Sequence, residues 1–176
     1  MTCKTKLSLI FSLTILLLVS CDPLVTEFPT KQAAREYEAN SITVPLNKDT
    51  LTVVTWNIRF GIGRAEWFGD SCGELVLFDK DEIQNGLELL AAKIIAMDAD
   101  ILLLQEVDID SKRSAYIDQV QWLLDNTTMN YGVYASMWEV QFVPSDGLGR
   151  VNTGNAILSR WPLSEAERLQ LSLRGD

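Results

Sequence analysis

Within residues 51–60 (LTVVTWNIRF), apolar and polar positions alternate from Val54 onward. A period of two places Val54 and Trp56 on one face of an extended segment, and Thr55 and Asn57 on the other. The segment is rich in Val, Thr, Ile and aromatic residues, which fit well into β-sheets. The pattern therefore predicts a strand over residues 51–60, which the glycines that follow it would end.

Residues 81–97 follow the period of a helix. Asp79, followed by Glu82, has the spacing of a capping box at the start of that helix. Residues 101–107 (ILLLQEV) form a continuous apolar run, which predicts a strand buried on both faces. Strand, helix and strand joined by short connections form a βαβ unit, so we expect the two strands to be parallel. The apolar positions of the helix recur at spacings of three and four residues: Ile83, Leu87, Leu90, Ile94 and Met97.

The rest of the chain has a less regular pattern. Together with the βαβ unit, it predicts one α/β domain over residues 51–176. We expect a helix over 112–125 with Tyr116 on its apolar face, a strand over 131–138, a loop over 144–153, a strand over 155–159 and an edge strand over 167–173.

The first 21 residues have the pattern of an export signal. Lys4 and Lys6 precede an apolar run that is too short to span a membrane comfortably. The run ends in LVSC, which resembles a bacterial lipobox and implies cleavage before Cys21 and lipidation of that residue. We therefore expect a signal peptide over residues 1–20 and a protein of the cell envelope, lipid-anchored to a bacterial membrane. The alternatives are a plain secretory signal or a short membrane anchor.

Residues 21–50 mix Pro, Thr, Glu, Lys and Ala with little periodicity. We expect the lipidated Cys21 to be followed by a tether that lifts the domain off the membrane, with a short helix over residues 33–39. Because Cys3 would leave with the signal peptide and Cys21 would be modified, Cys72 would have no partner. An internal disulfide is therefore not expected.

Composition narrows the possible chemistry. The chain of 176 residues contains no histidine, the commonest general acid or base and the commonest metal ligand. Its net charge of −9 argues against a non-specific nucleic-acid binder, which needs clustered Lys and Arg. Any reaction must therefore rest on carboxylates, amides, hydroxyls or arginine.

Asn57 and Glu106 are the candidate site residues. Each lies near the carboxyl end of a predicted parallel strand, where ligands of open α/β sheets collect. A hard cation such as Mg²⁺ needs only one or two protein carboxylates, with water and substrate oxygens as its other ligands. Taken alone, the pattern favours a solvated strand-end acid at Glu106, and Asn57 could equally be a structural amide. We expect Asp108 and Arg113, which follow, to lie in a solvated loop.

Three sequence segments, taken together, indicate the function more specifically than Asn57 or Glu106 alone. TWNIR (55–59), DILLLQEV (100–107) and GNAILSRWP (154–162) resemble, in order and spacing, the first three signature blocks of the endonuclease/exonuclease/phosphatase family. The resemblance implies a four-layer α/β sandwich and phosphoester hydrolysis that depends on Mg²⁺ or Mn²⁺. It also implies that Glu106 is a metal ligand and that Asn57 lies beside metal and phosphate.

The chain departs from the family pattern after Pro162. The family's later His, Asp-x-Asn and Asp-His motifs have no counterpart here. We therefore expect a truncated, N-terminal half of the sandwich that is inactive as a phosphodiesterase, phosphatase or nuclease by itself. The alternative is a non-catalytic, lipid-anchored binding or remnant protein. The expected partners are a phosphoester of unknown class and the membrane, through Cys21; no protein partner is predicted.

Overall fold

A computed structural model describes residues 25–70 and 73–172. Within these ranges, no helix has the length and apolar character needed to cross a membrane. The predicted signal peptide and Cys21 lie outside the described residues, as does Cys72, so their roles stay predictions.

A five-stranded sheet forms the body of the molecule, in the order β2-β5-β6-β4-β3. β3 and β4 are parallel, as the βαβ pattern predicts, and the other neighbours are antiparallel. A separate antiparallel pair joins β1 to β7. The strands are β1 (Lys31–Ala33), β2 (Arg35–Glu38), β3 (Val53–Asn57), β4 (Ile101–Asp108), β5 (Tyr131–Val143), β6 (Gly149–Ser159) and β7 (Glu167–Leu169).

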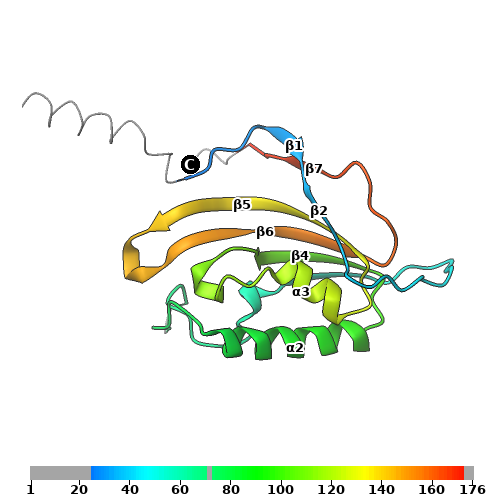
Figure 1. Cartoon of the computed structure of the whole chain (residues 1–176), viewed down its shortest axis with the longest axis horizontal. Coiled ribbons are helices and arrows are strands. Elements are labelled where there is room, and N and C mark those ends of the chain that lie inside the picture. Colours follow the sequence, from blue (N-terminus) through cyan, green and yellow to red (C-terminus); the bar gives the residue numbers. More distant parts are fainter. Residues whose placement is uncertain (1–24, 71–72, 173–176) are drawn as a thin grey trace, which may run out of the picture.

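Two helices cover one side of the sheet, whereas β1 and β7 lie on the other side (Figure 1). The first, α2, spans Lys80–Ala96, and the predicted capping box is present: Asp79 accepts from the backbone of Glu82, and Glu82 accepts from the backbone of Asp79. The second, α3, spans Gln119–Asn126. The predicted α/β class is confirmed, with one sheet and one helical layer of the expected sandwich.

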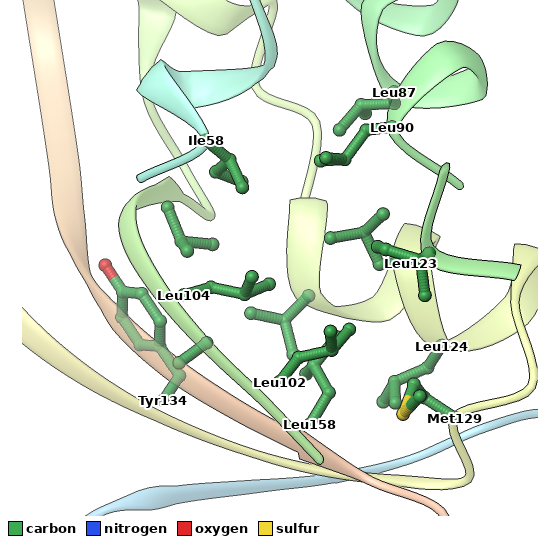
Figure 2. Packing of buried hydrophobic residues seen from close by; sticks show 14 of the residues in the cluster. Ile58, Leu87, Leu90, Leu102, Leu104, Leu123, Leu124, Met129, Tyr134 and Leu158 are labelled. Carbon is green, nitrogen blue, oxygen red and sulfur yellow. The ribbon is translucent and has the colours of Figure 1, made fainter. Parts of the chain in front are cut away.

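The core lies between the helices and the sheet (Figure 2). Leu87 and Leu90 of α2 meet leucines of the sheet and of α3 there. The side chains labelled in the figure include Ile58, Leu102, Leu104, Leu123, Leu124, Met129, Tyr134 and Leu158.

The first predicted strand is shorter than expected. β3 ends at Asn57, and a 3-10 turn follows over Arg59–Gly61, in which Arg59 and Phe60 both have positive φ. The predicted alternation of β3 is confirmed, because Val54 and Trp56 pack against the core while Asn57 is exposed.

β4 is not buried on both faces, which corrects the prediction from its apolar run. Leu102 and Leu104 are buried, whereas Ile101 and Leu103 are only partly covered. The helices cover a single face of the sheet, so the side chains on the other face of β4 keep part of their exposure.

The helix predicted over residues 112–125 is wrong in its first half. A 3-10 turn occupies Lys112–Ser114, after which Ala115 and Tyr116 adopt positive φ and end it. α3 begins only after Asp118, whose side chain accepts from the backbone N–H of Gln121. Tyr116 is 51% exposed and lies outside the core.

The second half of the loop predicted over residues 144–153 is strand. β5 and β6 form one long hairpin, joined by a short 3-10 turn over Ser145–Gly147. The predicted edge strand over 167–173 is confirmed only as β7. Its partner is β1, which the sequence pattern did not predict.

Residues 25–50 contact the domain instead of forming a free tether. Val25 bridges to Val140, and β2 pairs with β5 where a helix over 33–39 was expected. Tyr37 is buried, and Asn130 bonds to the backbone of Thr43. The predictions of a tether and of a helix are therefore wrong for the described part of this stretch. The pairing of β2 with β5 outweighs the weak helical preference of its sequence.

Candidate active site

A β-bulge interrupts β4 at its carboxyl end. Leu104 pairs with Ala156 of β6, the next pair is Val107 with Gly154, and the register shifts between them. Leu104 and Val107 both belong to the buried core on the helical side. The two residues between them, Gln105 and Glu106, therefore lie toward the opposite face, where strict alternation would have put only Gln105.

Glu106 is the distorted residue of the bulge. Its φ of 54° lies in the left-handed region, which costs a residue with a Cβ roughly 1 kcal/mol or more. Its side chain is partly covered. Among the described residues, no hydrogen bond or ion pair to its carboxylate is found. The bulge thus directs an unpartnered carboxylate to the open face of the sheet.

Asn57 lies on that same face, in the neighbouring strand. It pairs in register with Gln105, and side chains at paired positions of parallel strands point the same way. The side-chain oxygen of Asn57 accepts from the backbone N–H of Arg59 at 2.9 Å, which fixes the amide where the chain turns. The structure therefore brings Asn57 and Glu106 to one face at adjacent strand ends, as the sequence predicts.

Gln105 lies between them with its amide already engaged. Its Nε2 donates to the carbonyl of Leu103 at 2.9 Å and to the hydroxyl of Thr55 at 3.2 Å. These bonds tie β3 to β4 next to the bulge. Gln105 is thus a positioning residue, whereas the carboxylate of Glu106 beside it is left free.

Asp108 and Arg113 correct the prediction of a solvated loop. Asp108 is fully buried and Arg113 nearly so, and the guanidinium donates two hydrogen bonds of 2.9 Å to the carboxylate. Ser114 donates a third. This buried ion pair, which lies two residues beyond Glu106, fixes the end of β4. The residue types alone, in a polar stretch after a strand, gave no sign of burial.

The same network reaches the turn after β3. The side chain of Gln119 accepts from the backbone N–H of Asp108 and donates to the carbonyl of Phe60 at 2.7 Å. The guanidinium of Arg113 stacks 3.6 Å from the centre of the Phe60 ring, an energetically favourable cation–π contact. Both strand ends that carry the candidate site residues are therefore held by one buried polar cluster.

Two further groups complete the environment. Tyr134 donates to Asn152 at 2.8 Å, and burial together with the nearby Asp108 carboxylate raises the pKa of Tyr134 well above its ordinary value. Arg59 pairs with Asp70 and also donates to the carbonyl of Gly63. Arg59 therefore holds the loop after β3 in place.

The comparison with family models decides the relationship. The model of the endonuclease/exonuclease/phosphatase family matches residues 54–176, which is more than half of the chain. The chain belongs to the endonuclease/exonuclease/phosphatase family. All three sequence blocks that resemble this family fall within the matched range, and the first two contain the strand ends that bear Asn57 and Glu106.

One solved member of the family is similar to this chain. It is the endonuclease/exonuclease/phosphatase from Beutenbergia cavernae DSM 12333, with 22% sequence identity and a TM-score of 0.41. The match covers 64% of this chain and 26% of that protein. None of the curated proteins matches.

The family description, endonuclease/exonuclease/phosphatase, names enzymes that hydrolyse phosphoesters. The chain spans only 26% of the length of the solved member. In the part of the chain that the structure describes, no group of three or more His, Cys, Asp or Glu side chains could hold a metal. Any ion bound at Glu106 would therefore take most of its ligands from elsewhere.

Proposed function

We propose that this chain supplies the metal-binding part of a Mg²⁺-dependent phosphoester hydrolase, a phosphodiesterase or phosphatase that could include nuclease activity. The observation that carries the proposal is the bulge at Glu106. The backbone of Glu106 is left-handed there. Its carboxylate lies on the same face as Asn57 and has no partner among the described residues. Strain of this kind persists where the surrounding structure enforces it, and it is commonest at functional sites.

The donors present fit a hard cation. Glu106 offers carboxylate oxygens, and a Mg²⁺ or Mn²⁺ ion bound through one or two carboxylates keeps several positions for water and substrate phosphate. Such an ion polarises a phosphoryl oxygen. Glu106 would hold it, and the N–H groups of Asn57 would orient a water molecule or phosphate oxygen beside it.

The proton-transfer groups are not apparent in this chain, which has no histidine. We therefore propose that the 176-residue chain binds the metal but does not turn over substrate by itself. The substrate class stays open, because nothing in the described residues selects among nucleic acid, phospholipid and smaller phosphoesters.

Metal binding by the full chain tests the site. We expect Mn²⁺ binding, followed by isothermal titration calorimetry, to be lost in Glu106→Gln, which removes the charge but preserves the shape. Glu165→Gln is the matched control, because Glu165 has the same φ of 54° and is exposed elsewhere. Equal Mn²⁺ binding by the unsubstituted chain and Glu106→Gln would contradict the proposed site.

Hydrolysis of bis(4-nitrophenyl) phosphate by the same samples tests the second part. We expect no Mg²⁺-dependent release of nitrophenol from the unsubstituted chain. Release that is abolished by Glu106→Gln would show that the chain is active alone, and would strengthen the role of Glu106.

We also propose that the protein is exported and anchored to a membrane by lipid on Cys21. The support is the lipobox-like LVSC sequence after a short apolar run. We expect a bacterium that expresses the chain to incorporate labelled palmitate into it, and Cys21→Ser to abolish this. Cys72→Ser is the matched control and should be labelled normally. Equal labelling of Cys21→Ser would contradict the anchor.

A further inference from the structure

Asn155 lies directly opposite the bulge. In β6 it stands between Gly154, which pairs with Val107, and Ala156, which pairs with Leu104. A bulge places two residues of one strand against one residue of its neighbour, so Asn155 faces both Gln105 and Glu106. Ala156 is buried on the helical side, and Asn155 is exposed on the other side. Asn155 therefore lies on the same face as Glu106 and Asn57.

An asparagine at this position is unusual for a strand. β6 is the central strand of the five, and Asn is depleted in strands because its side chain competes with the backbone and packs poorly. The structure shows no compensating contact, since no hydrogen bond to the Asn155 side chain is found among the described residues. Its neighbour on β5 is Ala135, a small residue that leaves the space around the amide open.

The backbone at Asn155 is fixed by close packing. A Cβ added to Gly154 would lie 2.1 Å from the carbonyl oxygen of Ala135, so only glycine allows β5 to approach β6 here. This approach sets the register on one side of Asn155, and the bulge of β4 sets it on the other. The side-chain amide of Asn155 consequently has a fixed position along the strand relative to Glu106.

We propose that Asn155 binds the phosphoryl group of the substrate, by donating from its amide to a non-bridging oxygen. This inference rests on the proposed function. Asn57 on β3 and Asn155 on β6 flank β4, and two strand spacings separate them by roughly 10 Å. A phosphate held beside Glu106 would thus meet an amide donor from each side. Gln105 cannot serve in this way because its amide is engaged with Thr55 and Leu103.

Phosphate binding to the ¹⁵N-labelled full chain, in saturating Mg²⁺, tests this role. The side-chain amide resonances of Asn155 are identified as those missing from the spectrum of Asn155→Val. This substitution removes the side-chain donor and favours the strand. We expect these resonances to broaden on addition of Mn²⁺ and to shift with inorganic phosphate. Asn155→Val should bind Mg²⁺ within about twofold of the unsubstituted chain but bind phosphate about tenfold more weakly, the effect of losing one hydrogen bond to a charged group.

Two other variants sharpen the result. Asn155→Asp should lose phosphate binding altogether, because it places a second negative charge beside the anion. Ile157→Ala is the matched control, since Ile157 is exposed on the same face of β6, one position beyond the register of the bulge. It should leave both affinities unchanged. Thermal unfolding should show Asn155→Val to be at least as stable as the unsubstituted chain, whereas a purely structural asparagine would lose stability.

The outcomes separate this proposal from the one on which it rests. If Glu106→Gln abolishes Mg²⁺ binding but Asn155→Val binds phosphate like the unsubstituted chain, the role of Asn155 is wrong and the metal site stands. If the unsubstituted chain binds neither Mg²⁺ nor phosphate, both proposals are wrong.

Discussion

Asp100, directly before β4, and Glu106, near the carboxyl end of β4, are acidic residues in opposite situations. At the amino end, Asp100 is fully buried and each of its oxygens has a partner: Lys48 at 2.8 Å and the backbone N–H of Thr52 at 2.9 Å. At the carboxyl end, Glu106 is partly exposed, and no partner is found for it among the described residues. Of these two carboxylates, one thus stabilises the fold, whereas the fold leaves the other free.

The difference extends to the surroundings and the backbone. Asp100 belongs to a network in which Arg160 bonds to Asp98 at 2.6 Å and Lys48 bonds to both acids. Glu106 stands alone in a bulge with positive φ. We therefore call the Asp100 end of β4 structural, because the charge of Asp100 is satisfied. We call the Glu106 end functional, because an unpaired carboxylate there belongs to a residue with a strained backbone.

The largest effect is expected at the structural end. Asp100→Asn should lower the free energy of unfolding by about 2 kcal/mol, because a charge-assisted hydrogen bond from Lys48 to a buried carboxylate is lost. Chemical denaturation measures the change, and Asp110→Asn, whose partner Arg150 is exposed, is the control with an expected loss of under about 0.5 kcal/mol. Equal losses in both variants would contradict the distinction.

The pH dependence of stability should report the same network. Burial opposes ionisation of Asp100, but Lys48, the backbone of Thr52 and Arg160 together hold its pKa below the ordinary value. The stabilisation is therefore present above about pH 4, the unfolded value, and is lost as the pH falls through the folded pKa. In Asp100→Asn, the free energy of unfolding should therefore fall less steeply at acid pH. An unchanged slope would show that other groups cause the loss of stability at acid pH.

At alkaline pH, the loss of stability that tyrosines cause should be the same in Asp100→Asn as in the unsubstituted chain. Burial and then the charge of Asp118 raise the pKa of Tyr37, and burial raises that of Tyr134. Both groups stabilise the fold below about pH 10 and lose this contribution as the pH rises further. The losses of stability at acid and at alkaline pH therefore report different parts of the molecule.

A smaller effect of opposite sign is expected at the functional end. Glu106→Gly should raise the free energy of unfolding by about 1 kcal/mol, because glycine adopts positive φ without steric cost. The same substitution should abolish Mn²⁺ binding. Glu165→Gly, at the same φ of 54°, should give a similar gain in stability with Mn²⁺ binding intact. A loss of stability in Glu106→Gly would show that its side chain supports the fold.

Local patterns in the sequence predicted the elements whose formation depends on residues close together in the chain. The capping box, the period of α2 and the parallel pair β3–β4 depend on residues near one another in the chain. All three are confirmed, except that Met97 lies beyond the end of α2 and is exposed. Strand-end polarity was also enough to predict that Asn57 and Glu106 lie at neighbouring strand ends, whereas the face on which Glu106 lies depends on the bulge.

The features that tertiary contacts create were not predictable from these patterns. The bulge arises where β4 meets β6, and the burial of Asp108 and Arg113 depends on Gln119 and Phe60 closing over them. Strand β2 forms because β5 lies beside it. One signal could have been used: Gly154 inside an apolar strand indicates a close backbone approach, and it would have drawn attention to Asn155.

The bridge between Val25 and Val140 limits how far the domain can stand from a membrane. If Cys21 carries lipid as proposed, the four residues that lead to Val25 span at most roughly 14 Å, even when fully extended. The domain would then lie next to the lipid headgroups with a restricted range of orientations, and would not move freely on a long tether. Phosphoesters of the bilayer surface would then lie within its reach, beside those that diffuse to it.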